Sequence, residues 1–141
     1  MHKNWLLVTG IGIASFGPVF ALGAMTGTAE AARWSLDLLS WPLDGNMDYQ
    51  APTTRFLSAL TGGFLFGWGV MVLLLRAWVF DAAPDGVRKA VLGGLIAWCV
   101  LDSSGSYASG NASNILFNLL VLLTLAGPLW VRARQDLVQP R

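Results

Sequence analysis

The residues best suited to chemistry lie in one polar stretch, from Asp102 to Asn118, between two strongly apolar segments. The stretch contains one carboxylate, three asparagine amides and no basic residue. Such groups can bind a proton, a cation or a polar ligand, or they can hold two helices together. We predict that they form a polar cluster with an arginine from an earlier connection. The predicted members are Asp102, Ser106, Asn111, Asn114, Asn118 and Arg55.

Most catalytic chemistry is excluded by residue type. The one histidine is His2, near the start of the chain, and the one cysteine is Cys99. This argues against histidine-ligated haem or metal, Ser–His and Cys–His catalysis, and an intrachain disulfide. Asp102 has no second carboxylate at its depth, so paired-aspartate catalysis is excluded too. We expect no metal or cofactor and, on balance, no enzyme; a bound lipid and a substrate-assisted lipid reaction stay open.

The composition indicates that these residues are positioned by membrane-spanning helices. The chain has 141 residues, of which 55% are hydrophobic and 12% charged, whereas soluble domains average about 25% charged. Four apolar runs approach the ~20 residues needed to cross a ~30 Å hydrocarbon core. We predict an all-α membrane protein forming one domain over residues 1–141, with four transmembrane helices in an antiparallel bundle. The expected spans are about 5–25, 56–80, 90–109 and 112–131.

Basic residues predict how the spans are oriented. Two lie in the first connection, Arg33 and Arg55, and the rest lie on the opposite side. Those in the two tails and the second connection are Lys3, Arg76, Arg88, Lys89, Arg132, Arg134 and Arg141. Cytoplasmic segments are enriched in Lys and Arg, so both termini should be cytoplasmic. The preference for Arg and the compact size favour a bacterial inner membrane. The net charge of +1 gives no reason to expect a nucleic-acid partner.

The first outer connection contains an amphipathic segment at about 29–41. Trp34, Leu38 and Trp41 share one helical face, and charged residues, including Arg33 and Asp37, share the other. A short helix of this kind should lie in the membrane interface. It either covers the bundle or docks another protein or lipid. The tryptophans expected as interface anchors are Trp5, Trp34, Trp41, Trp78 and Trp130.

Small residues predict where helices pack closely. They recur along one face of the first span, at Gly10, Ala14, Gly17 and Ala21, and in the second span as Gly63-x-x-x-Gly67. Helices in lipid associate through such faces because their backbones can approach each other.

Helical rise predicts which polar side chains meet. Asp102 lies thirteen residues after Lys89, and Asn118 lies fourteen before Arg132. Each is therefore about 20 Å above the inner side, at 1.5 Å per residue. Asp102 should contact Asn118, and Ser106 should contact Asn114 one turn higher. An ionisable group at that depth costs about 2.5–3.5 kcal/mol to insert, so it is usually paired or functional.

Two function classes follow. The first is a non-catalytic accessory or assembly subunit that packs on membrane partners or on further copies of itself. The alternative is an oligomeric carrier or sensor of protons, cations or a small polar solute that uses Asp102. A structural Asp102, held by neighbouring polar groups or by Arg55, fits the first class; an Asp102 that faces a wet cavity fits the second.

Overall fold

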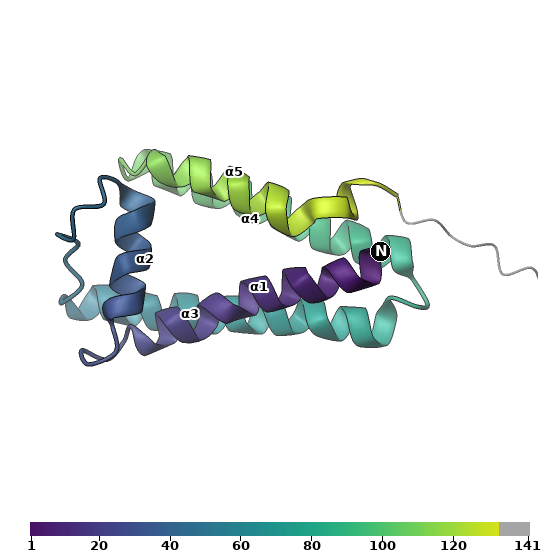
Figure 1. Cartoon of the computed structure of the whole chain (residues 1–141), viewed down its shortest axis with the longest axis horizontal. Helices are drawn as coiled ribbons and strands as arrows, with labels where there is room; N and C mark the ends of the chain where they lie inside the picture. Colours follow the sequence, from purple (N-terminus) through teal and green to yellow (C-terminus); the bar gives the residue numbers. More distant parts are fainter. Residues whose placement is uncertain (133–141) are drawn as a thin grey trace, which may run out of the picture.

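The computed structural model describes residues 1–132, and that range is helical with no strand (Figure 1). The elements are α1 (His2–Leu22), α2 (Glu30–Ser40), α3 (Pro52–Leu74) with a π-helical continuation η1 (Leu75–Val79), α4 (Pro84–Ala108), and α5 (Ser113–Ala126) with a 3₁₀ turn η2 (Gly127–Trp130). Arg134 and Arg141, which contributed to the predicted orientation, lie outside the described residues.

Three helical segments are long and apolar enough to cross a membrane, which indicates a membrane protein. They are His2–Leu22, Pro52–Val79 and Ser113–Trp130. The helix between the last two, α4, is long enough, but its last two turns are rich in serine and follow Asp102. Length and composition therefore support three spans, and the predicted four-span bundle is not confirmed by them.

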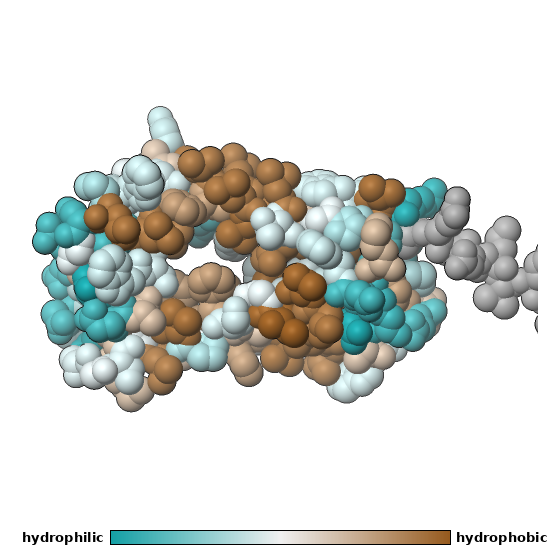
Figure 2. Space-filling view, viewed as in Figure 1, coloured by the Kyte–Doolittle hydropathy of each residue, from teal (hydrophilic) through white to brown (hydrophobic). Residues whose placement is uncertain are grey.

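The long helices form two pairs, α1 with α3 and α4 with α5 (Figure 1). We call the end that carries α2 the outer end and the opposite end the inner end. The pairs pack together toward the inner end, around a core that includes Leu6, Val91 and Leu129. They separate toward α2, and the space-filling view shows an opening between them there (Figure 2). A second core, which includes Phe20, Ala32 and Tyr49, lies under α2.

Glycines bring α1 and α3 into backbone contact. A Cβ added at Gly62 would lie 2.6 Å from the Gly17 carbonyl oxygen, and one at Gly69 would lie 2.6 Å from that of Gly10. Ala14 and Ala21 lie against the same two glycines of α3. The predicted small-residue face of α1 is therefore a packing face.

The predicted Gly63-x-x-x-Gly67 face of α3 takes no part in this contact. Within residues 1–132, nothing lies within 4 Å of a Cβ added at Gly63 or Gly67. The glycines that meet α1 are seven residues apart, as are Gly10 and Gly17, so both pairs stay in register over two turns. Gly63 and Gly67 lie on another side of α3 because a helix turns by about 100° per residue.

At the inner end, α1 is tied to α5 through one carbonyl. The indole Nε1 of Trp5 donates to the Leu125 oxygen at 3.0 Å, and the Thr9 hydroxyl donates to it at 2.8 Å. Carbonyls in the last turn of a helix lack helical donors, and α5 ends at Ala126. The Trp5 ring also lies where a Cβ of Gly127 would be. Trp5 was predicted as an interface anchor, but here it packs between helices.

At the outer end, α2 connects the two pairs. The Tyr49 hydroxyl donates to Ser58, which donates to the Phe20 carbonyl, and this holds the α2 connection on α1 and α3. On the other side, the Ser113 hydroxyl donates to the Leu39 carbonyl at 2.7 Å and so joins α5 to the end of α2. The predicted interfacial helix at 29–41 thus corresponds to α2, and it lies across the opening between the pairs.

The polar side of α2 faces the adjoining loop. Arg33 forms an ion pair with Glu30 at 2.9 Å, and this hydrogen bond holds the pKa of Glu30 below its usual value. Asp37, 2% exposed, forms no ion pair with Arg33 on the same face; its carboxylate accepts the Gly45 backbone N–H. The burial of Asp37 turns the Trp34 side of α2 outward, where that indole is exposed.

Candidate functional site

Asp102 accepts two hydrogen bonds from the neighbouring helix. Asn118 Nδ2 lies 2.6 Å from Asp102 Oδ2, and Asn114 Nδ2 lies 2.9 Å from the same oxygen. The first of these contacts was predicted, because the helical rise places Asp102 and Asn118 at the same height. The carboxylate thus joins α4 to α5 close to the outer end, six residues before α4 ends at Ala108.

Two serines complete this polar contact. Asn114 Nδ2 also donates to Ser106 Oγ at 2.8 Å, as predicted, and Asn118 Nδ2 donates to Ser103 Oγ at 3.1 Å. The Ser106 hydroxyl in turn donates to the backbone carbonyl of Asp102 at 2.8 Å. Asn118 is 4% exposed, whereas Asp102 is half-buried, so the contact is covered on the Asn118 side.

Two predicted members lie apart from this group. Asn111 is exposed in the turn between α4 and α5, and its amide approaches Ser109 Oγ at 3.4 Å. Arg55 has no hydrogen bond or ion pair with Asp102 within residues 1–132, and its buried Nε has no partner there. Arg55 belongs to α3, on the other helix pair, and the pairs separate toward the outer end. Arg55 therefore lies apart from the Asp102 cluster.

The charge of Asp102 has no basic counterpart within the described residues. The ion pairs there join Lys3 to Asp81, Glu30 to Arg33, and Asp85 to both Arg88 and Lys89. The pairs of Lys3 with Asp81 and of Asp85 with Arg88 and Lys89 lie at the inner end. The hydrogen bonds from Lys89 and Arg88 lower the pKa of Asp85 to about 2. Asp102, in contrast, is balanced only by neutral amides.

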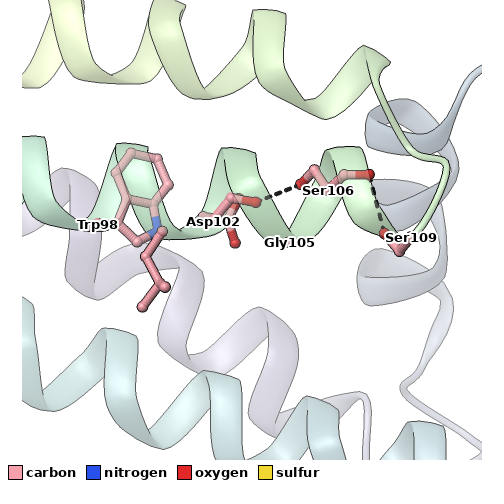
Figure 3. A pocket seen from close by; sticks show the side chains of 6 residues that line it. Trp98, Asp102, Gly105, Ser106 and Ser109 are labelled. Carbon is pink, nitrogen blue, oxygen red and sulfur yellow. Dashed lines mark hydrogen bonds between the residues drawn. The ribbon is translucent and has the colours of Figure 1, made fainter.

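A hollow of about 450 Å³ runs along the face of α4 that carries Asp102 (Figure 3). Trp98, Asp102, Ser106 and Ser109 follow one another along it toward the outer end. The remaining lining residues are Leu101 and Gly105. Trp98 packs against Trp68 of α3, with ring centroids 6.3 Å apart and planes tilted by 54°.

The cluster offers a carboxylate, amides and hydroxyls, and its hydrogen bonds show where those hydroxyl protons are directed. No group of three His, Cys, Asp or Glu residues that could hold a metal ion occurs within residues 1–132. Two serine hydroxyls near Asp102 donate to backbone carbonyls, Ser104 to Val100 and Ser106 to Asp102. A nucleophile needs a base that accepts its proton, and these protons point elsewhere.

Sequence reasoning missed three polar contacts. Ser103 joins the Asp102 cluster, Thr9 binds the freed carbonyl of Leu125, and Arg88 donates to the Leu129 carbonyl at 2.9 Å. A threonine one turn after Trp5 in an apolar helix was a detectable signal, because a buried hydroxyl and a buried indole N–H both need acceptors. The acceptors themselves are backbone carbonyls of distant residues, which no side-chain pattern marks.

Comparison with known proteins found no match: no family model fits the chain, and no curated protein or solved structure is detectably similar to it.

Proposed function

We propose that the chain is a four-span integral membrane protein in which α4 is the fourth span. The three apolar helices constrain the path: α3 and η1 end at the inner end, whereas α5 starts at the outer end beside α2. The chain has to return between them, and α4 is the segment that does so. At 25 residues its length is about 37 Å, enough for a ~30 Å core.

The proposed orientation has both termini in the cytoplasm of a bacterial inner membrane. Its support is the excess of Lys and Arg in the tails and the second connection. His2 Nε2 lies 2.9 Å from the Val131 carbonyl, so the two ends of the described chain share the inner end. Thiol labelling of a cysteine introduced at Asn4 or Asn46, in a Cys99→Ser background, tests this: a membrane-impermeant reagent added to spheroplasts should modify only the second.

For the protein's role, we propose a non-catalytic accessory or assembly subunit that packs on membrane partners. The observation that carries this proposal is the free glycine pair of α3. Gly62 and Gly69 are used against α1, whereas Gly63 and Gly67 are open to the surroundings between exposed Phe64 and other apolar side chains. In lipid, where apolar side chains gain nothing by clustering, an open small-x-x-x-small face favours close association with another helix.

The outward side of α2 supports the same role. Trp34, Leu38 and Trp41 are exposed at the outer end, where indole rings favour the membrane interface or a partner's surface. Together the two faces offer one contact within the bilayer and one at its surface.

Purification in mild detergent followed by native mass spectrometry tests the proposal. A stoichiometric companion, or a defined oligomer of this chain, should be retained by the wild type and lost in a Gly63→Leu, Gly67→Leu double variant. Gly93→Leu serves as the control, because Gly93 is an exposed glycine of α4 with open space around it. A wild-type protein that is strictly monomeric and without a companion would contradict the proposal.

A second candidate, an oligomeric carrier or sensor of protons, cations or a small polar solute, is favoured by the state of Asp102. Its carboxylate receives two neutral donors, has no basic partner within residues 1–132 and lines a hollow. Four short spans give one copy a poor pathway, so several copies would be needed. Asp102→Asn should then abolish ion flux in proteoliposomes while the melting temperature changes little. If the variant lowers only the melting temperature, Asp102 is structural.

A further inference from the structure

The hollow beside Asp102 is an open groove along one face of α4, and its volume falls in the range of small-molecule sites. Its volume of about 450 Å³ lies within the roughly 300–1,000 Å³ typical of ligand pockets. One wall is apolar, formed by Trp98 and Leu101, and the polar groups are concentrated at Asp102 and two serines. Such a lining fits a ligand that has one polar group on an apolar body.

The hydrogen bonds already formed decide which sign of charge the hollow favours. The Ser106 hydroxyl donates to the Asp102 carbonyl, and the Ser109 hydroxyl donates to the Ser106 carbonyl at 3.1 Å. Asn114 and Asn118 direct their amide N–H groups at Asp102 Oδ2 and at serine oxygens. The polar atoms that Asp102 and the two serines leave for a ligand are therefore oxygen acceptors, which bind donors and cations and repel anions.

A second feature favours an organic cation over a metal ion. Calcium takes 6–8 oxygen ligands, and magnesium needs near-octahedral geometry. The hollow provides one carboxylate and two hydroxyl groups. It also provides an indole ring one helical turn from that carboxylate, backed by Trp68. A carboxylate next to an aromatic face is the combination that binds ammonium groups.

From these contacts we infer that the hollow binds an organic cation, with a protonated or quaternary ammonium group at Asp102 and an apolar body against Trp98 and Leu101. This deepens the carrier-or-sensor candidate by naming its ligand class, and it rests on that candidate. The ammonium group supplies the positive charge that the described residues do not place beside Asp102. The opening between the helix pairs, bordered by apolar side chains, suits a ligand that arrives from the bilayer (Figure 2).

Binding is tested with the full chain in phosphatidylcholine nanodiscs, by isothermal titration against empty nanodiscs. The probe is benzyltrimethylammonium, whose charge does not change with pH, and the comparison is its uncharged carbon isostere, neopentylbenzene. The cation should bind saturably, at one per chain, and about tenfold or more tightly than the isostere. Asp102→Asn keeps an acceptor for Asn114 and Asn118 but removes the charge, so it should weaken cation binding by about tenfold or more.

Two further variants separate the aromatic contact from general packing. Trp98→Leu should weaken binding by about two- to thirtyfold, and Trp98→Phe should retain part of the affinity because it keeps an aromatic face. Neopentylbenzene should discriminate much less between these two variants. Equal losses for both, with both probes, would overturn the cation–aromatic contact.

A matched pair of glycine variants tests the location. Among the residues that the structure describes, no atom lies within 4 Å of a Cβ added at Gly105 or at Gly93, and of these two glycines Gly105 lines the hollow. Gly105→Leu should abolish binding without lowering the melting temperature, whereas Gly93→Leu should bind as the wild type does. Binding that persists in both Gly105→Leu and Asp102→Asn would overturn the inference.

The test also separates failure of this inference from failure of the candidate it rests on. Suppose that sodium stabilises the wild type but not Asp102→Asn, and that benzyltrimethylammonium does not bind. The site then takes inorganic cations, so the organic-cation inference is wrong while the carrier candidate survives. If neither cation binds and Asp102→Asn leaves ion flux unchanged, both are wrong.

Discussion

Asn118 Nδ2 lies 2.6 Å from Asp102 Oδ2, and this hydrogen bond joins α5 to α4 in the half of the molecule where the two helix pairs separate. The inner half is stabilised by a shared apolar core and by ion pairs. The outer half of the α4/α5 pair relies more on polar contacts: the Asp102 group within the pair and the Ser113–Leu39 hydrogen bond to α2. Substitutions in the two halves should therefore have different effects.

Asn118→Leu should destabilise the protein by about 1–2 kcal/mol, because it removes a hydrogen bond to a carboxylate and leaves that charge less satisfied. Reversible unfolding in mixed micelles measures the change. Asn111→Leu is the control, since Asn111 is exposed and has no contact with Asp102. Equal effects at the two positions would show that the amide contributes nothing specific.

Gly62→Ala should lower stability by about 1–3 kcal/mol through overpacking, because its Cβ would lie 2.4 Å from the Ala21 backbone nitrogen. The adjacent Gly63→Ala should be neutral or stabilising by up to about 1 kcal/mol, since Ala is the better helix former and the space is open. Unfolding of the two variants side by side makes the comparison. A Gly63→Ala variant as unstable as Gly62→Ala would place the α1–α3 contact on the wrong face.

Thr9→Val keeps the side-chain shape but removes the hydroxyl that donates to the Leu125 carbonyl. We expect a loss of about 1 kcal/mol and faster hydrogen exchange in the last turn of α5. Thr61→Val is matched to it, because the Thr61 hydroxyl bonds only to Leu57 of its own helix and is exposed. If hydrogen exchange in the last turn of α5 is unchanged in Thr9→Val, Trp5 alone maintains the contact between α1 and α5.

Asp85 should give stability a specific dependence on acid pH. Its pKa is lowered from 3.8 to about 2 by Lys89 and Arg88, so its ion pairs stabilise the folded state above about pH 4 and weaken as the pH falls through about 2. The difference in melting temperature between wild type and Asp85→Asn should therefore shrink from pH 5 to pH 2.

Asp44→Asn is the control for that series, because the Asp44 side chain accepts only a local backbone N–H. Its difference from wild type should be small and nearly independent of pH. A wild-type advantage over Asp85→Asn that is as large at pH 2 as at pH 5 would contradict the assignment of the lowered pKa to these ion pairs.

Local properties were predictable from the sequence alone. Apolar runs of sufficient length placed the helix ends to within six residues, the largest difference being the start of α4 at Pro84 where residue 90 was predicted. The constant rise of a helix predicted that Asp102 and Asn118 lie at the same height, and two helices joined by a short turn have to be antiparallel neighbours. The small-residue face of α1 was evident from its spacing for the same reason.

Only the tertiary structure decided which faces meet. Four glycines of α3 fall on different sides of one helix, and the choice of Gly62 and Gly69 over Gly63 and Gly67 depends on the register of α1. Arg55 and Asp102 lie on different helix pairs, and sequence spacing carries no information on the angle at which pairs separate. No lining residue of the hollow beside Asp102 belongs to either apolar core, and where those cores form is a property of the packed chain.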